Sequence, residues 1–288
     1  MRTLARLPLP ALYALTAPLA WAARSLLRYR TDVVLNNLST SFPLATQAQI
    51  KSIARGFYSW FGRWAADTLK LAAMSEAEAR SRLHLEGFDA PLAALAAGRH
   101  VSLFLGHYAN WEWLSSIPLH LPPETIPTQI YHPLENATAD AFFLRARGRF
   151  GAISIPMETA ARELLMLSRR GPTITGYIAD QAPGARGVLH WTEFLHHDTA
   201  FYTGAERISA HLHAACFYID VRPLGRGRYA ARFEPLCADA SALPSGELTE
   251  AYARALERTI CRRPDLWLWS HRRWKRGRTP GETSPRDI

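Results

Sequence analysis

The chain has 288 residues, of which 48% are hydrophobic and 20% are charged. This composition excludes an intrinsically disordered chain and allows one large domain or two small ones. The formal net charge of +9, carried almost wholly by arginine, indicates an acidic partner such as an anionic membrane, a nucleic acid or an acidic carrier protein. The three cysteines, Cys216, Cys237 and Cys261, lack close spacing, so they predict neither a zinc site nor a disulfide framework, and a reducing compartment fits best.

Residues 7–27 form an apolar stretch with arginines on both sides, and three interpretations of it remain open. Ala20-Trp21-Ala22 resembles a signal-peptide cleavage site after an apolar core. Three prolines and Arg24 weaken the case for a spanning helix. An amphipathic segment lying in the membrane interface, with its arginines on lipid phosphates, fits both the prolines and the flanking charge. We therefore expect a membrane-associated segment over residues 1–30, followed by a domain over residues 31–276.

A long amphipathic helix is predicted over residues 49–71, because large apolar side chains recur there at three- and four-residue spacing: Ile53, Phe57, Trp60, Phe61, Trp64 and Leu69. The aromatic side chains are interpreted as core, with contact to lipid or an acyl chain as the alternative. A shorter helix over residues 75–82 begins with a Ser-x-x-Glu pattern. A short strand over 84–87 and an Ala-rich helix over 91–98 complete this region.

The apolar run over residues 101–105 predicts a buried strand, and Asn110 suits the N-cap of a following helix. His107 therefore falls at the carboxyl end of a strand, where ligands and catalytic groups collect in open α/β sheets. On one continuous helix, residues five apart would point about 140° away from each other. His107 and Glu112 can thus meet only if His107 lies in the turn and Glu112 in the first helical turn. We expect Glu112 to accept from one ring nitrogen of His107 and leave the other free to take a proton.

A helix is predicted over residues 136–149, ending at Gly151. Three arginines crowd its last turn, where cations suit the helix dipole, and that effect alone could account for them: Arg145, Arg147 and Arg149. A strand over 153–156 and a helix over 159–170 follow.

The apolar strand over residues 173–179 ends in Asp180-Gln181-Ala182-Pro183-Gly184. A charged residue in a turn at the carboxyl end of a strand repeats the geometry expected for His107. The alternative interpretation of Asp180 is a carboxylate that only caps the turn.

The remaining histidines are interpreted as surface or loop residues and not as metal ligands: His196, His197, His211 and His213. Gly225-Arg226-Gly227-Arg228-Tyr229-Ala230 formally matches a dinucleotide fingerprint, but it lies between two strand-like runs and predicts a hairpin turn. After a helix over 248–262, aromatic residues alternate with cations over 267–275, a pattern that single-stranded nucleic acid binding could also explain. Residues 277–288 are expected to be disordered.

Five blocks stand in the order found in one known family: Tyr29 to Pro43, His107-x4-Glu112, Arg147-Gly148-Arg149-Phe150-Gly151, Asp180-Gln181-x-Pro183-Gly184, and Trp267-x-Trp269-x-His271-Arg272-Arg273-Trp274-Lys275. Over roughly residues 10–276 the sequence resembles the lipid A late acyltransferases of the lauroyl/myristoyl type, within the lysophospholipid acyltransferase-like group. Their signature is His-x4-Asp/Glu. The resemblance implies an α/β fold with a mixed, largely parallel central sheet flanked by helices, as in glycerol-3-phosphate acyltransferase.

The resemblance also implies the reaction, which is acyl transfer from an acyl-carrier-protein thioester to a hydroxyl of a lipid A-type acceptor. It implies that an arginine binds acceptor phosphate or stabilises the oxyanion; we favour Arg149, with Arg147 as the fallback. Asp180, with Gln181 beside it, becomes a candidate for acceptor binding. No cofactor, metal or nucleic acid is expected. The partners are the acyl-carrier protein, an anionic lipid acceptor and the membrane surface, at the cytoplasmic face of a bacterial inner membrane.

In the expected mechanism, His107 removes the acceptor hydroxyl proton, Glu112 orients the ring, and the oxygen attacks the thioester carbonyl. No acyl-enzyme is expected, because the sequence lacks a Gly-x-Ser-x-Gly elbow and a cysteine beside His107. Alternatives remain open: a transferase of the same scaffold for a phosphatidylinositol mannoside, an amino-acid lipid or a polyene lipid, a thioester hydrolase, or a non-enzymatic basic binding module at the membrane.

Overall fold

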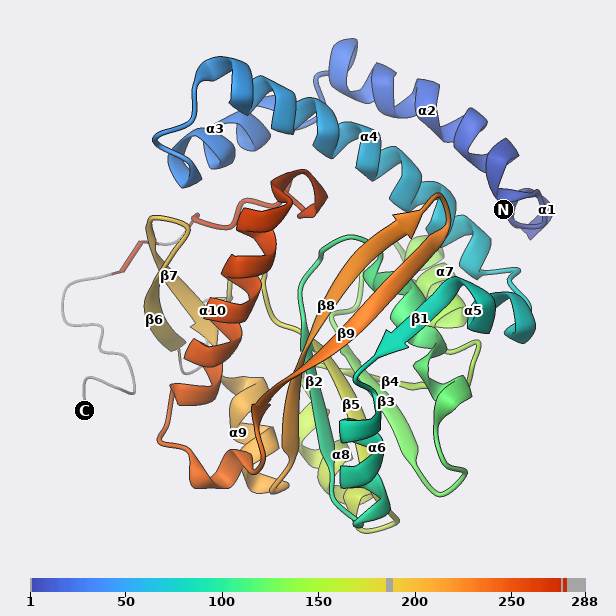
Figure 1. Cartoon of the computed structure of the whole chain (residues 1–288), viewed down its shortest axis with the longest axis vertical. Coiled ribbons are helices and arrows are strands. Elements are labelled where there is room, and N and C mark those ends of the chain that lie inside the picture. Colours follow the sequence, from blue (N-terminus) through green and yellow to red (C-terminus); the bar gives the residue numbers. More distant parts are fainter. Residues whose placement is uncertain (1, 185–188, 276, 279–288) are drawn as a thin grey trace.

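A seven-stranded sheet organises residues 2–184, 189–275 and 277–278, which this computed structural model describes (Figure 1). Its order is β1-β9-β8-β2-β5-β3-β4, and its strands are β1 Leu83–Glu86, β2 Val101–Leu105, β3 Ile126–Tyr131, β4 Ile153–Pro156, β5 Thr173–Ile178, β8 Ala215–Gly225 and β9 Arg228–Cys237. Every neighbouring pair runs parallel except β8 and β9. The predicted mixed, largely parallel sheet is therefore confirmed.

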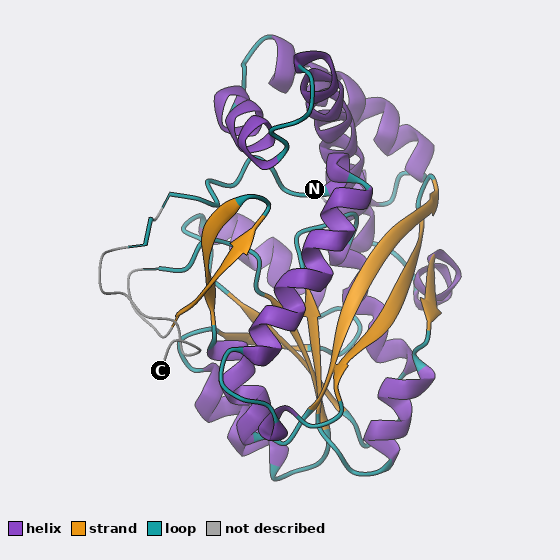
Figure 2. Ribbon diagram, turned by 60° about the vertical axis from the view of Figure 1, so that its left-hand side comes forward, coloured by secondary structure: helices purple, strands orange, loops and turns teal. Residues whose placement is uncertain are grey.

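Helices flank this sheet, and a small hairpin of β6 Leu189–Phe194 and β7 His197–Tyr202 lies beside α10 (Figures 1 and 2). The α-helices are α1 Arg2–Ala5, α2 Leu9–Ser25, α3 Thr31–Ser41, α4 Gln47–Leu71, α5 Glu76–Arg82, α6 Asp89–Ala96, α7 Ala137–Arg147, α8 Ala160–Ser168, α9 Gly204–His211 and α10 Glu247–Arg262. Three 3-10 helices are η1 Trp111–His120, η2 Ala240–Ala242 and η3 Pro264–Leu266. The tail expected to be disordered lies outside the described residues, apart from 277–278.

Strand β2 lies inside the sheet between β5 and β8, and all five of its residues are buried. Its apolar sequence fits this position, because a strand that is covered on both faces does not show the alternation of apolar and polar side chains seen in a strand with one exposed face. Leu105 at its end pairs with Ile178 at the end of β5. The two turns that follow these strands therefore leave the same edge of the sheet side by side.

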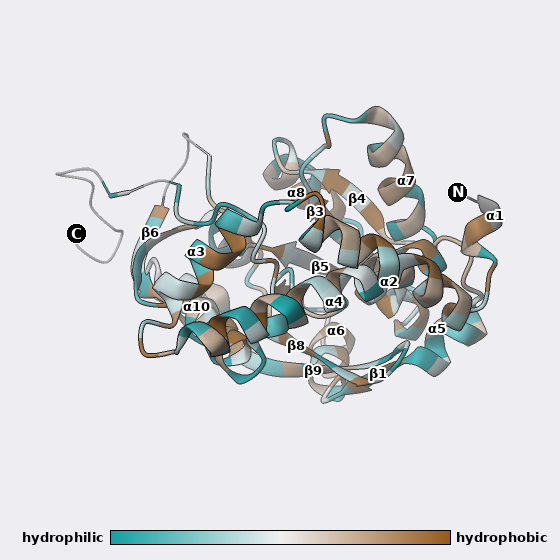
Figure 3. Cartoon of the chain, turned by 90° about the horizontal axis from the view of Figure 1, so that it is seen from above, coloured by the Kyte–Doolittle hydropathy of each residue, from teal (hydrophilic) through white to brown (hydrophobic). Residues whose placement is uncertain are grey.

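Helices α2, α3 and α4 form a layer above this edge, which Figure 3 views from above. Helix α4 begins at a capping box in which Thr46 and Gln49 satisfy each other's backbone N–H groups. Helix α2 packs along α4, with Leu9 and Leu12 buried in the same core as the sheet. Within the described residues, none of the helices is both long enough and apolar enough to cross a membrane.

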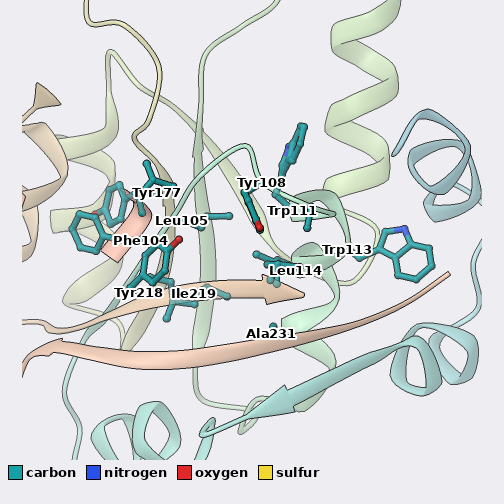
Figure 4. Close-up of a cluster of buried hydrophobic side chains, with 14 of the residues drawn as sticks. Phe104, Leu105, Tyr108, Trp111, Trp113, Leu114, Tyr177, Tyr218, Ile219 and Ala231 are labelled. Carbon is teal, nitrogen blue, oxygen red and sulfur yellow. The ribbon is translucent and has the colours of Figure 1, made fainter. Parts of the chain in front are cut away.

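Large aromatic side chains fill the space between α4, η1 and the sheet (Figure 4). Trp60 of α4 packs against Trp111, and its indole N–H donates to the carbonyl of Ala109 at 2.9 Å. Trp113 donates from its indole to the carbonyl of Asp67, 2.9 Å away. The prediction that the aromatic face of this helix is core is confirmed for Phe57 and Trp60, which are almost fully buried. This packing fixes the turn that follows β2 from above.

Two elements differ from the sequence expectation. The helix after Asn110 is η1, a 3-10 helix with Pro118 inside it, although Asn110 does accept from the N–H of Trp113 as an N-cap. The β6–β7 hairpin was not predicted. Leu195 and His196 in its turn have positive φ, although neither is a glycine or asparagine, the residue types that indicate such a turn in a sequence. The hairpin turn at Gly225-Arg226-Gly227 is confirmed between β8 and β9.

Candidate active site

The turn after β2 is held rigidly by neighbouring backbone. Ala109 has a left-handed backbone with φ of 50°, and its N–H donates to the carbonyl of Leu266 at 2.9 Å. Gly106 is required here, because a Cβ at this position would lie 2.7 Å from a methyl carbon of Leu256 and 3.2 Å from Asp180 Oδ2. The close approach that glycine allows brings His107 beside the turn that follows β5.

Asp180 is the carboxylate partner of His107. Its Oδ1 lies 2.6 Å from His107 Nδ1, and its Oδ2 accepts from the backbone N–H of His107 at 2.8 Å. The indole of Trp267 donates to the same Oδ2 at 2.7 Å. The Asp180 side chain is 2% exposed and the His107 side chain 17% exposed, so the pair is sheltered and one edge of the ring remains accessible.

The ionised state of Asp180 fixes the tautomer of His107. Burial alone raises the pKa of this carboxyl, but the neighbouring His107 ring and the hydrogen bonds from His107 and Trp267 outweigh it, and the pKa lies below its ordinary value. An ionised carboxylate can only accept, so Nδ1 of His107 carries the proton. In a neutral ring Nε2 is then the acceptor, and the side-chain nitrogen of Gln181 lies 3.3 Å from it. Nε2 is therefore the basic nitrogen of the His107 ring, with the Gln181 side chain as its neighbour.

Glu112 does not contact His107, contrary to the expectation from the His-x4-Glu spacing. Its two carboxylate oxygens accept from Nη2 and Nε of Arg147 at 2.7 and 2.8 Å, a bidentate ion pair in which the Glu112 side chain is 1% exposed. The physical reason is the register of the sheet. Leu105 pairs with Ile178, so the residues two positions further along each chain, His107 and Asp180, meet. Glu112 follows in η1 and faces the end of α7 instead.

The two candidate arginines, Arg149 and Arg147, lie in different surroundings. Arg149, which we favoured from the sequence, donates to the carbonyls of Met74 at 2.8 Å and Ala72 at 3.2 Å, just after the end of α4. Its guanidinium thus satisfies backbone carbonyls that helix α4 and its following turn leave unpaired. Arg147, the fallback, lies on the wall of a cavity. Which of the two arginines contacts substrate stays a prediction.

That cavity encloses about 690 Å³ of empty space, including its open mouth. Its wall comes from β2, β3, β5, β8 and η1 and is mainly apolar: Leu103, Leu105, Leu114, Ile117, Ile130, Ile174, Ile178 and Ile219 contribute to it. Trp111 also lines the cavity and packs edge-on against the His107 ring with 5.0 Å between centroids. Trp111 thus contacts the His107 ring and also borders a cavity whose apolar wall suits an apolar chain.

Two residues of the carboxyl-terminal aromatic block belong to this site and were not assigned from the sequence. Trp267 orients Asp180, as described above. His271 accepts at Nε2 from the N–H of Ala182 at 3.0 Å, and its burial lowers its pKa to about 4 despite the nearby Asp180 charge. A neutral His271 thus holds the segment that carries Gln181. The alternation of tryptophan and histidine over residues 267–271 could have indicated functional side chains, but it does not show that they contact Asp180 and Ala182.

No group of three or more histidine, cysteine or carboxylate side chains able to hold a metal ion occurs in the part of the chain that the structure describes. His211 and His213 are exposed, and His196 lies in the β6–β7 turn, as expected. His197 differs, since it stacks on Trp274 with 4.1 Å between ring centroids.

Comparison with protein families gives one match, to the model described as bacterial lipid A biosynthesis acyltransferase, over residues 1–276. The chain belongs to this family. The match covers the whole sheet, the His107–Asp180 pair and the carboxyl-terminal aromatic block. No curated protein matches the chain. Membership of a bacterial lipid A biosynthesis acyltransferase family confirms the resemblance carried by the five sequence blocks and supports acyl transfer in general.

Proposed function

We propose that this family member transfers a fatty acyl chain from an acyl-carrier-protein thioester to a hydroxyl of a lipid A-type acceptor, with His107 as the general base. The observation that carries the proposal is the hydrogen bond between Nδ1 of His107 and the buried carboxylate of Asp180. It leaves Nε2 unprotonated, and Trp111, which packs against this ring, also lines an apolar cavity. A base in this tautomer can take the proton of a hydroxyl while the oxygen attacks a thioester carbonyl.

Each remaining residue has a role in this proposal. Asp180 stabilises the imidazolium that forms when His107 takes the proton, without being protonated itself. Gln181, 3.3 Å from Nε2, binds the acceptor next to its reacting hydroxyl. Arg147, held by Glu112, offers its remaining N–H groups to a substrate oxygen, so Glu112 is a positioning residue for Arg147. The apolar cavity accepts the acyl chain.

The membrane surface is proposed as the place of reaction. Helix α2 and the two residues after it expose large apolar side chains in the layer above the edge of the sheet that carries His107: Leu15, Leu19, Trp21, Leu26 and Leu27 are 48 to 78% exposed. Such side chains lower their free energy by entering the boundary of a bilayer. A soluble thioester donor would then place the protein on the cytoplasmic face of a bacterial inner membrane.

Single-turnover acyl transfer by His107→Ala tests the proposal. With an acyl-carrier-protein thioester and a lipid A precursor, the rate should fall about a hundredfold or more, the usual contribution of a general base. His211→Ala, which removes an exposed histidine on α9, is the matched control and should keep the parent rate. Circular dichroism verifies that both variants fold. Undiminished transfer by folded His107→Ala would exclude the general base.

The same assay tests donor and acceptor. Replacing the carrier-protein thioester with the coenzyme A thioester should lower kcat/KM, because the basic surface loses its acidic protein partner. Omitting the lipid acceptor should stop thioester consumption; continued release of free fatty acid would instead identify a hydrolase. Mass spectrometry of lipids from a deletion strain identifies which lipid loses a chain.

A further inference from the structure

A second cavity lies between α2 and α4, away from the active site. It encloses about 1530 Å³ of empty space, including its open side, and no residue lines both this cavity and the one beside His107. One wall is the apolar face of α2, with Leu9, Ala17 and Trp21. Gly62 of α4 allows the two helices to approach closely, because a Cβ there would lie 2.7 Å from Cβ of Ala20.

Five arginines from four parts of the chain line this second cavity: Arg24 of α2, Arg55 and Arg63 of α4, Arg82 of α5, and Arg226 of the β8–β9 turn. Arg82 pairs with Glu78 at 2.9 Å. Among the residues that the structure describes, the other four have no carboxylate within ion-pair distance. Cations that line one cavity without directly paired carboxylates repel one another, and an anion in the cavity would relieve that repulsion. We name this cavity the arginine pocket.

A buried polar atom in the same pocket also lacks a partner. Thr16 lines the pocket and is 8% exposed, and its hydroxyl makes no hydrogen bond to the described residues. A buried hydroxyl without a partner is costly, so such groups usually face a ligand or water. The nearby Asp67 does not fill this need, because its carboxylate accepts from Tyr229 and from Tyr13, which also lines the pocket. Guanidinium groups without a carboxylate partner, of which Arg24 and Arg63 donate to serine hydroxyls, are the donors that a phosphate attracts.

The surroundings of the pocket indicate where such a phosphate comes from. Trp21 lines the pocket and is 55% exposed, and Leu15 and Leu19 on the same helix are 48 and 67% exposed. A headgroup phosphate in the pocket would leave its acyl chains beside these apolar side chains. Figure 3 shows α2 and α4 side by side across the top of the molecule, where a bilayer can approach. A free phosphate would use the arginines and leave the apolar wall unused.

We propose that the arginine pocket binds the phosphate of an anionic membrane lipid that is not the acyl acceptor. The site orients the protein on the bilayer, with the edge of the sheet that carries His107 facing the lipid. Binding requires no turnover, so it is independent of the proposed acyl transfer, and His107→Ala should bind vesicles like the parent protein.

Vesicle sedimentation of the full chain tests this site. Arg55→Gln/Arg63→Gln should lose about tenfold or more in affinity for vesicles of phosphatidylcholine mixed with phosphatidic acid, since each surface arginine contributes roughly a few-fold or more. The matched control is Arg169→Gln/Arg170→Gln, which removes the same charge from exposed positions just after α8, at the opposite end of the molecule. The control should lose less than about threefold. If the first variant does not fold, Arg24→Gln/Arg226→Gln, on α2 and the hairpin turn, takes its place and should show the same loss of vesicle affinity.

Equal losses in the pocket and control variants would show that overall charge alone draws the protein to the membrane, and would overturn the proposal. Unchanged binding by both pocket variants would do the same. Calorimetry separates the two sources of phosphate: dihexanoyl phosphatidic acid should bind the parent protein and not Arg55→Gln/Arg63→Gln, whereas equally tight binding of inorganic phosphate would assign the pocket to a free anion and not to lipid.

Discussion

Asp180 accepts three hydrogen bonds with two carboxylate oxygens, and this count decides what its replacement would do. The donors are the backbone and ring of His107 and the indole of Trp267. An asparagine has one acceptor oxygen. Its NH₂ group would either face the donors of Trp267 and the His107 backbone, or it would face His107 Nδ1. In the second case Nδ1 must become the acceptor, and Nε2 would carry the proton and lose its basicity. The residue therefore controls the tautomer as well as the charge.

The Glu112–Arg147 pair gives a stability prediction at the same scale. Glu112→Gln should lower the free energy of unfolding by about 3 kcal/mol, because it leaves a largely buried guanidinium without its counter-charge. Glu112→Gln/Arg147→Met should recover most of that loss, since the uncompensated charge is then gone. Denaturant unfolding of both variants measures the difference. A loss of unfolding free energy in the double variant that equals the sum of the losses in Glu112→Gln and Arg147→Met alone would contradict the ion pair.

At the residue scale the sequence placed His107 at the end of a strand but expected Glu112 as its hydrogen-bond partner, where the structure has Asp180. The histidine is marked by local order, since it follows an apolar strand. Its partner depends on which strand lies beside β2 and in what register, and a motif six residues long contains neither. Arg147 and Arg149 differ only in where the end of α7 directs each side chain. Spacing within one segment could not supply these facts, which belong to the assembled sheet.

At the scale of elements, Asp67 joins α4 to three other parts of the chain. Its fully buried carboxylate accepts from Tyr13 of α2 at 2.7 Å and from Tyr229 of β9 at 2.6 Å. The side chain of Asn110 donates to it at 3.3 Å, which connects this network to the turn after His107. Burial raises the pKa of Asp67 to about 6, although the hydrogen bonds from the two tyrosines act to lower it.

This network predicts a pH dependence of stability. The folded-state pKa of about 6 exceeds the ordinary value of 3.8, so the unfolded chain releases this proton first as the pH rises. The contribution of Asp67 to stability should therefore fall by about 3 kcal/mol between roughly pH 4 and 6 and stay level above that. Asp67→Asn removes the titration. Denaturation from pH 4 to 7.5 measures the unfolding free energy of parent and variant. As the pH rises, the parent should lose stability relative to Asp67→Asn, and a constant difference between the two proteins would refute the raised pKa.

Elements with strong periodicity were predictable and those set by tertiary packing were not. The helix of residues 49–71 was found to within two residues, because its apolar spacing and the following turn are local signals. The β6–β7 hairpin was missed, since Leu195 and His196 adopt positive φ without a residue type that favours it. The 3-10 form of η1 follows from packing against α4 and from Pro118, and an N-cap asparagine cannot distinguish it from an α-helix.

Over the whole molecule, helix α4 separates two kinds of surface. Its aromatic face, with Trp60 and Trp64, packs against Trp111 beside the active-site cavity. Its other face contributes Arg55 and Arg63 to the arginine pocket. One helix thus connects the proposed membrane contact to the turn that carries His107. The basic composition predicted an acidic partner, but only the fold gathers arginines from four separate segments into one pocket.

The central claim is that Asp180, and not Glu112, holds the proton-bearing nitrogen of His107. Nitrogen-15 NMR of histidine-labelled protein measures this directly, through the strongly deshielded proton shared by Nδ1 of His107 and its carboxylate. We expect this signal to persist in Glu112→Gln and to disappear in Asp180→Asn, with His107→Ala providing its assignment. A signal that survives in Asp180→Asn and vanishes in Glu112→Gln would contradict this claim.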